Sequence, residues 1–283
     1  MTWSERQRLM LQEMGIRLWA PAAESAADGM PSPSELPATP GVPAAPAVPA
    51  RPSAPGLRAD DAVAPRAEAR AGAEAAPPAA AADARAAAIA VMPWPQLREA
   101  VAGCRACGLC ETRRQTVFGV GNPQAHWMIV GEAPGEQEDL KGEPFVGAAG
   151  HLLDSMLHAL GLTRGEAAPD KQVYIANTLK CRPPRNRNPE PEEMLRCEPF
   201  LLRQIELIRP KLILAMGRFA VQALLRTPEP IGKLRGRVHR YQGVPLVVSY
   251  HPAYLLRNLP DKARAWDDLL LAAQVADAAS ASG

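Results

Sequence analysis

Residues 127–135 read WMIVGEAPG, an apolar run followed at once by a loop with two glycines and a proline. A short apolar run that ends in turn residues is typical of a buried β-strand. Similar apolar runs recur further along the chain, and we expect a strand at each of them: residues 173–179, 212–216 and 244–249. The sequence therefore predicts four buried strands.

Helical patterns lie between these predicted strands. At residues 148–160 the apolar side chains recur at helical spacing, so that they share one face: Leu152, Leu153, Met156, Leu157 and Leu160. Further helices are expected at residues 94–102, 191–208, 218–225 and 261–276. Alternating strands and helices predict an α/β fold of three layers (α/β/α), with a central, mostly parallel, four-stranded sheet.

Composition divides the chain into segments. Residues 21–93 consist mostly of Ala and Pro and cannot bury enough apolar surface to offset the entropy of ordering, so we expect a disordered linker. Residues 94–276 are long enough for one folded domain, and residues 277–283 are expected to be a disordered tail. Residues 1–20 carry apolar side chains near one helix face, which suggests a docking helix.

Charge and cysteine content narrow the setting. The formal net charge is +2, and the five cysteines are an odd number in a chain without a recognisable export signal. We therefore expect a cytoplasmic, reducing environment, a monomer, and no association with a membrane. The basic side chains of Arg182, Arg185 and Arg187 lie close together in sequence, either as a solvated loop or as a contact for a polyanion.

Polar residues follow three of the predicted strands. Gly131 and Glu132 come after the first, Asn177 lies at the end of the second, and His251 follows the fourth. In parallel sheets, ligands bind where the carboxyl ends of strands meet their loops. The sequence thus predicts one pocket formed by three distant segments.

Four cysteines indicate a metal centre. Cys104 and Cys107 form a C-x2-C pair, and Cys181 and Cys197 lie far downstream. Thiolates at this spacing bind soft metals, and four of them suit either zinc or an iron–sulfur cluster.

The motifs together resemble the iron–sulfur, family 4 uracil-DNA glycosylases. The resemblance lies in GEAPGEQED (residues 131–139), PFVG (residues 144–147), N-x3-CRPP-x-NR (residues 177–187) and HPAYLLR (residues 251–257). It implies an enzyme that flips uracil out of DNA and hydrolyses its N-glycosidic bond. It also implies a [4Fe–4S] cluster on Cys104, Cys107, Cys181 and Cys197, with Cys110 as a spare thiol.

The resemblance assigns residues to the uracil site. Asn177 would hydrogen-bond the N3–H and O4 of uracil, Phe145 would stack on the ring, and His251 would donate to O2. Gly131, Glu132 and Ala133 would line the pocket. Better-known glycosylase families carry Asp or Asn where this chain has Ala133, so either Glu132 or Glu138 is the candidate for positioning water, with Asn186 expected to bond Glu138.

The same resemblance implies contacts with DNA. Arg182, Arg185 and Arg187 would face phosphates, while Leu255, Leu256 and Arg257 would probe the duplex where the base has left. The substrate would be uracil-containing DNA, either single- or double-stranded.

Two further hypotheses concern partners and class. Residues 11–19 (LQEMGIRLW) resemble the start of the psi subunit of the bacterial clamp loader, so residues 1–20 are a candidate docking peptide for that assembly. One alternative is therefore a non-catalytic, clamp-loader-associated protein on a glycosylase-like scaffold. Another is a uracil-binding protein that becomes covalently linked to DNA, but residues 139–145 lack the His-containing insertion typical of that class.

Overall fold

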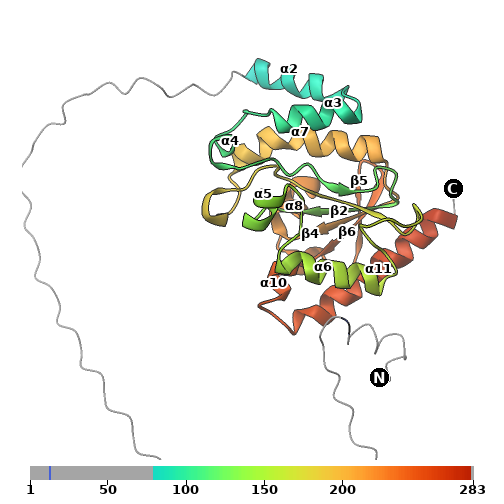
Figure 1. Cartoon of the computed structure of the whole chain (residues 1–283). Coiled ribbons are helices and arrows are strands. Elements are labelled where there is room, and N and C mark those ends of the chain that lie inside the picture. Colours follow the sequence, from blue (N-terminus) through green and yellow to red (C-terminus); the bar gives the residue numbers. More distant parts are fainter. Residues whose placement is uncertain (1–12, 14–78, 282–283) are drawn as a thin grey trace, which may run out of the picture. The chain divides into compact units, whose positions relative to one another are not determined.

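The structure is a computed structural model that describes Glu13 and residues 79–281 (Figure 1). The predicted docking helix at residues 1–20, apart from Glu13, and most of the predicted linker lie outside the described residues. Within the described part, no helix is long and apolar enough to cross a lipid bilayer.

A six-stranded mixed sheet forms the centre of the fold, in the order β1-β3-β2-β4-β6-β5. Its four inner strands are parallel, as the sequence predicted: β2 (Trp127–Gly131), β3 (Val173–Asn177), β4 (Leu212–Met216) and β6 (Val244–Ser249). Two short antiparallel strands that were not predicted extend the edges, β1 (Val120–Gly121) and β5 (Val238–Tyr241). Both strands remain partly exposed at the edges of the sheet, so they need no continuous apolar run, and neither has one.

Helices cover both faces of the sheet, which gives the predicted three layers. Successive side chains of a strand point to opposite faces. Trp127 and Ile129 therefore pack in the layer of α6 (Ala148–Ala159) and α11 (Asp261–Ala281). Met128 and Val130 pack in the opposite layer, with α7 (Pro191–Ile208) and α8 (Arg218–Leu225). Figure 1 shows α7 on one side of the sheet and α6 with α11 on the other.

The strand register determines where the functional loops meet. Gly131 pairs with Asn177, so β2 and β3 end side by side. On its other side, β2 pairs with β4, and β4 in turn pairs with β6. Strand β6 ends two residues before His251. Short elements follow the ends of β2, β3 and β6, respectively: α5 (Glu136–Lys141), a 3₁₀ turn (Pro184–Asn186) and α10 (Pro252–Leu255). A further short helix, α9 (Ile231–Leu234), lies between α8 and β5.

Two domain boundaries differ from the sequence prediction. Helix α2 (Ala79–Ala90) lies inside the predicted linker, and α11 continues to Ala281 through most of the predicted tail. Ala has the highest helix propensity, which suits both segments. Helix α2 also packs on α7 and leaves only 2% of Ile89 exposed, so it is part of the fold. Helices α3 (Trp94–Ala102) and α4 (Leu109–Thr112) then lead into and out of the first cysteine pair.

Candidate active site

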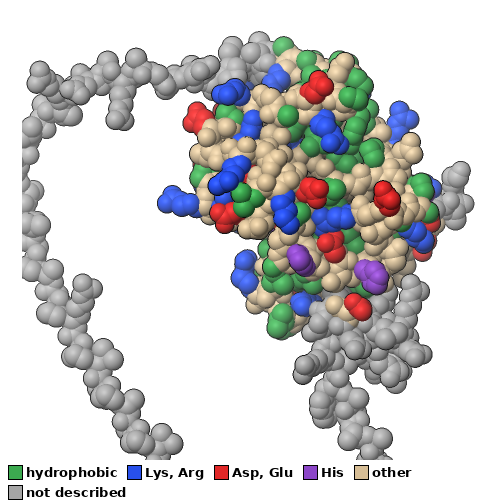
Figure 2. Space-filling model, in the orientation of Figure 1, with side chains coloured by type: hydrophobic (Ala, Val, Ile, Leu, Met, Phe, Trp, Pro, Cys, Tyr) green, Lys and Arg blue, Asp and Glu red, His purple; other side chains and the backbone are tan. Residues whose placement is uncertain are grey.

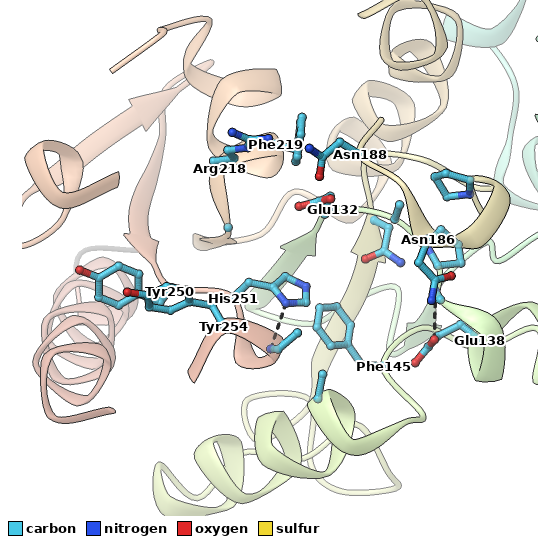
Figure 3. Close-up of a pocket in the computed structure, with 18 of the residues that line it drawn as sticks. Glu132, Glu138, Phe145, Asn186, Asn188, Arg218, Phe219, Tyr250, His251 and Tyr254 are labelled. Carbon is cyan, nitrogen blue, oxygen red and sulfur yellow. Dashed lines mark hydrogen bonds between the residues drawn. The ribbon is translucent and has the colours of Figure 1, made fainter. Parts of the chain in front are cut away.

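A cavity of about 680 Å³ opens at the carboxyl ends of β2, β3, β4 and β6 (Figure 3). Residues from all of the predicted pocket segments line it. The cavity is lined by polar, charged and aromatic side chains together with a small one, among them Glu132, Ala133, Glu138, Phe145, Asn177, Arg187, Asn188, Arg218, Tyr250, His251, Tyr254 and Arg257. The three segments that the sequence placed in one pocket therefore do converge.

Gly131 lies beneath this cavity, where a side chain would not fit. A Cβ at this position would be 2.5 Å from Oδ1 of Asn177 and 2.6 Å from Cζ of Phe145. The absence of a side chain lets the Asn177 amide and the Phe145 ring approach each other over the end of β2. Gly131 therefore acts through its backbone, and it does not line the cavity.

The amide of Asn177 is buried yet incompletely paired. Only 2% of the residue is exposed, and its Oδ1 has no hydrogen-bond partner within the described part of the chain. Buried polar atoms almost always have a partner, and an unpaired one costs about 1–3 kcal/mol. The Asn177 Oδ1 can therefore accept a hydrogen bond from a donor in the cavity.

Phe145 and His251 form a stacked pair in the cavity wall. Their ring centroids are 5.2 Å apart, and their planes are inclined by 26°. Phe145 has a φ of 55°, which is unusual for a residue with a side chain. Such strain is concentrated at functional sites, where the surrounding structure maintains it.

His251 is held as a neutral donor. The backbone N–H of Ala253 donates to Nδ1 of His251 at 3.2 Å, so the remaining ring proton resides on Nε2. Burial lowers the pKa of His251 from 6.5 to about 4, opposed only in part by the Glu138 carboxylate. Around neutral pH the imidazole therefore offers one N–H donor without a net charge.

Glu132 follows β2 and faces the cavity. Burial raises the pKa of its carboxyl from 4.5 to about 7, and the positive charge of Arg218 opposes that rise. Figure 3 shows Glu132 and Arg218 on the same side of the cavity. A carboxyl with a pKa near neutrality is suited to accept a proton from water.

The Glu138 carboxylate holds the loop that contains Phe145. Its oxygens accept from the backbone N–H groups of Gly135 (3.0 Å), Val146 (2.9 Å) and Gly147 (3.1 Å). These bonds join the start of α5 to the PFVG segment. Asn186, expected to bond Glu138, accepts from Nε of Arg182 through its Oδ1 at 2.7 Å, and Figure 3 shows its side chain next to that of Glu138.

The structure separates Leu255 from Leu256. Leu255 was expected to probe DNA, but it is 0% exposed and packs in the core, because α10 docks on α6. This corrects the expectation for Leu255. Leu256 is 42% exposed, and Arg257 lines the cavity.

The predicted basic cluster is largely ion-paired. Arg187 donates to both carboxylate oxygens of Glu193, at 2.9 and 2.6 Å, and Arg182 lies 3.5 Å from the carboxylate of Glu136. Arg185 is exposed, and none of the described carboxylates forms a salt bridge with it. Figure 2 likewise shows basic side chains interspersed with acidic ones on one face of the molecule.

The cysteines line a second, much smaller cavity. All four predicted ligands are there, together with Cys110, and all five thiols are free. Arg113 donates to Sγ of Cys181 at 2.9 Å, and the backbone N–H of Lys180 donates to Sγ of Cys197 at 3.3 Å. Among the described residues, no three His, Cys, Asp or Glu side chains are arranged to hold a single metal ion.

Burial strongly affects the two downstream thiols. It raises the pKa of Cys181 to about 11 and that of Cys197 to about 12, while nearby Arg113 and Lys180 respectively oppose the rise. Thiolates here need compensating positive charge. The cationic side chains and the N–H groups around the sulfurs suit an iron–sulfur cluster.

Several cavity residues escaped the sequence analysis. Arg218, Asn188, Tyr250 and Tyr254 all line the cavity. Arg218 could have been found by the rule that located Glu132 and His251, because it follows the carboxyl end of β4. Tyr250 and Tyr254 stack with centroids 5.0 Å apart, and their spacing of four residues is one at which side chains meet on a helix.

Comparison with known proteins agrees with this geometry. Residues 118–270 match the family model described as the uracil DNA glycosylase superfamily, and the chain belongs to that superfamily. The chain is 46% identical to the type-4 uracil-DNA glycosylase of Archaeoglobus fulgidus over 164 residues, which covers 55% of this chain and 79% of the relative. It is 43% identical to the type-4 enzyme of Thermotoga maritima over 168 residues (59% and 84%).

A type-5 relative is more distant. The type-5 uracil-DNA glycosylase of Pyrobaculum aerophilum is 33% identical over 149 residues, 49% of this chain and 66% of the relative. Within the superfamily, the chain therefore belongs with the type-4 uracil-DNA glycosylases, which are hydrolytic enzymes.

Proposed function

We propose that this chain flips uracil out of DNA into the cavity and hydrolyses its N-glycosidic bond, which begins base excision repair. The observation that carries the proposal is the buried, unpaired Oδ1 of Asn177 beside the Phe145–His251 stack. An everted base is read by hydrogen bonds to its Watson–Crick edge and by stacking on aromatic rings. These side chains provide both kinds of contact.

Asn177 provides the selection for uracil. Its Oδ1 accepts from N3–H and its Nδ2 donates to O4, so a single amide satisfies the imide edge. Cytosine presents an acceptor at N3 and a donor at N4, and it would leave buried groups unpaired, a cost of about 1–3 kcal/mol for each.

His251 stabilises the leaving base. When the bond between C1′ and N1 breaks, its electron pair moves into the uracil ring and negative charge accumulates at O2. The Nε2–H of neutral His251 donates to that oxygen, as a preorganised oxyanion hole does. No proton transfer is needed, because the low pKa of His251 keeps it neutral.

Glu132 is the stronger candidate for positioning water. In the proposed step, the water oxygen forms a bond to C1′ while the Glu132 carboxylate receives the proton from that water. The Glu138 carboxylate is already bound to three backbone N–H groups, so we assign it the holding of the Phe145 loop. Ala133 lines the pocket, and Gly131 leaves the room in which Asn177 and Phe145 approach each other.

For contact with DNA, we propose Leu256, Arg257 and Arg185. Leu256 is exposed beside the cavity and suits the gap that the flipped base leaves in the duplex. Arg185 carries a charge without a described ion pair, so it is better suited than Arg182 or Arg187 to meet a phosphate. Those two would first have to leave their carboxylate partners.

We further propose that Cys104, Cys107, Cys181 and Cys197 hold a [4Fe–4S] cluster. All four sulfur ligands line one cavity, where Arg113 and the backbone N–H of Lys180 donate to two of them. The cluster would link the segment before β1 to the loop after β3, a structural role.

The test is a uracil-release assay on single- and double-stranded oligonucleotides, together with the iron content and visible absorbance of the purified protein. We expect uracil release, iron near the stoichiometry of one cluster, and loss of selectivity or activity in Asn177→Asp. A matched control is Asn122→Asp, whose amide bonds Gln172 away from the cavity. Full uracil selectivity in Asn177→Asp would contradict the pocket assignment, and colourless active protein would contradict the cluster.

For residues 1–20 we propose docking to the replication clamp loader, on the resemblance of the peptide alone. Removal of these residues should reduce capture of the clamp loader and leave uracil release from short oligonucleotides unchanged. Equal capture with and without the peptide would contradict this docking.

A further inference from the structure

Lys180 is a buried lysine between the active-site cavity and the cysteine cavity. Only 1% of the residue is exposed. Its Nζ donates to the backbone carbonyl of Asn177 at 2.8 Å and to Oε1 of Gln204 at 2.6 Å. Both acceptors are neutral, so this ammonium group is not part of an ordinary ion pair with a carboxylate.

The bond to Asn177 completes a two-sided hold on one peptide group. The carbonyl of Asn177 accepts from Lys180, and the N–H of the same peptide, that of Thr178, donates to the carbonyl of Gly131 at 3.0 Å. The hydroxyl of Thr178 also donates to the carbonyl of Glu132 at 2.5 Å. The backbone that carries the Asn177 amide is thus fixed from both sides.

Gln204 anchors the other end of the lysine. It is 0% exposed and lies on α7, the helix that also carries Cys197. Its Nε2 donates to the carbonyl of Phe118 at 2.9 Å and to the hydroxyl of Tyr174 at 3.2 Å. The backbone N–H of Lys180 meanwhile donates to Sγ of Cys197. Lys180 therefore ties the end of β3 to α7 through both its side chain and its backbone.

A merely space-filling role does not explain a lysine here. Burying an ammonium group is costly, and an apolar side chain of similar length would fill the volume without that cost. The ammonium adds positive charge beside Cys197 and a charge-assisted bond to the Asn177 carbonyl, which is shorter and stronger than a neutral one. The charge affects the cysteine site, whereas the bond affects the position of Asn177.

We infer that Lys180 is a positioning residue for uracil recognition, which holds the Asn177 amide where it meets the imide edge of the base. The inference rests on the proposed function, in which Asn177 reads uracil. It implies that uracil recognition and the cysteine site are joined in the loop after β3. There Asn177 reads the base, and Lys180, which fixes Asn177, directly precedes Cys181.

The experiment measures inhibition of uracil release by free uracil, because the inhibition constant reports the pocket without the rest of the DNA. Lys180→Met removes the ammonium and keeps the length of the side chain. We expect the inhibition constant to rise roughly tenfold, which corresponds to about one lost hydrogen bond. The Michaelis constant for uracil-containing DNA should rise in parallel.

Two variants of Gln204 test the same bond from its other end. Gln204→Leu removes the acceptor and should reproduce part of the Lys180→Met effect, whereas Gln204→Glu keeps an acceptor and should restore uracil inhibition. A stability control is Leu269→Ala, a fully buried position in the layer of α6 and α11. At a comparable loss of thermal stability, it should leave the inhibition constant unchanged.

The outcomes separate this inference from the proposed function. A wild-type chain that releases no uracil would overturn the function itself. Suppose instead that the wild type releases uracil and that the inhibition constant of Lys180→Met lies within about twofold of the wild-type value. Such a change is smaller than the loss of one hydrogen bond would produce, and it would overturn the positioning role. Should Lys180→Met fail to fold, Gln204→Leu decides in its place: an unchanged inhibition constant overturns the inference, and a raised one that Gln204→Glu restores supports it.

Discussion

The imidazole ring of His251 stacks on the phenyl ring of Phe145, with centroids 5.2 Å apart. The two residues are far apart in the sequence, and each is proposed to contact a different part of the base. Because the rings also contact each other, a change in one alters the support of the other.

We therefore expect Phe145→Leu to impair both binding and the chemical step. Loss of base stacking should cost roughly 1–3 kcal/mol, seen as a higher Michaelis constant. Loss of the ring beneath His251 should also lower kcat. Leu keeps the strain of the positive φ, since it too has a side chain. The control is Phe118→Leu, which packs on Trp94 outside the cavity. A rise in the Michaelis constant with unchanged kcat would show that the stack does not support His251.

The rate of uracil release should depend on pH through Glu132. Its pKa of about 7 means that the carboxylate form, which accepts the proton, increases as the pH rises through neutrality. His251 does not account for this change, because its pKa of about 4 leaves it neutral over the whole interval. Single-turnover rates should be half-maximal near pH 7 and should level off about one to two pH units higher. Glu132→Gln should be slow and pH-independent there, and an unchanged profile would contradict the assignment.

Arg218 should shift that profile. Its positive charge favours the ionised form of Glu132, so Arg218→Met should raise the pKa of Glu132 further and move the midpoint of the rate to higher pH. A matched control is Arg226→Met, at a guanidinium 74% exposed and paired with Glu198. A midpoint that stays in place in Arg218→Met would show that solvent screens the charge.

The sequence predicts the parallel core well, because buried strands need continuous apolar runs such as residues 127–130. It misses β1 and β5, since edge strands need no such run. It also misses α2, whose Ala-rich composition matches that of a linker. What distinguishes α2 from a linker is the burial of Ile89 and the contacts of Arg85 with Arg196 and Phe200 on α7.

In the site, motifs identify the residues but not their tasks. Either Glu132 or Glu138 was expected to position water, and the motif does not show that the Glu138 carboxylate accepts from three backbone N–H groups. Leu255 and Leu256 are adjacent and chemically identical, and only the docking of α10 on α6 separates core from surface.

Arg85 should help retain the proposed cluster. Its guanidinium donates to the carbonyl of Arg196 at 2.8 Å, lies 3.6 Å from Sγ of Cys104, and packs 4.9 Å from the centre of the Phe200 ring. It thereby joins the two cysteine segments from α2. Arg85→Met should speed loss of iron to a chelator by about tenfold, as other residues that support metal ligands do.

The control for this prediction is Arg203→Met. Arg203 lies on α7 and, like Arg85, donates to a backbone carbonyl, that of Met92 at 2.8 Å, but within the described residues no bond joins it to a cysteine sulfur. Decay of visible absorbance measures both variants, independently of uracil release. Equal decay in Arg85→Met and Arg203→Met would mean that docking of the segment matters, and not the contact with sulfur.

The adjacent leucines after His251 should behave differently when each is shortened. Leu255→Ala leaves a cavity in the core and should lower the free energy of unfolding by about 2–5 kcal/mol, measured by denaturant titration. Leu256→Ala changes an exposed side chain, so stability should change by less than about 0.5 kcal/mol. Its effect should instead appear in uracil release, and more strongly on duplex than on single-stranded DNA, because only the duplex has a stack to refill when the base leaves. If Leu256→Ala slowed both substrates equally, the side chain would be supporting the pocket rather than entering the duplex.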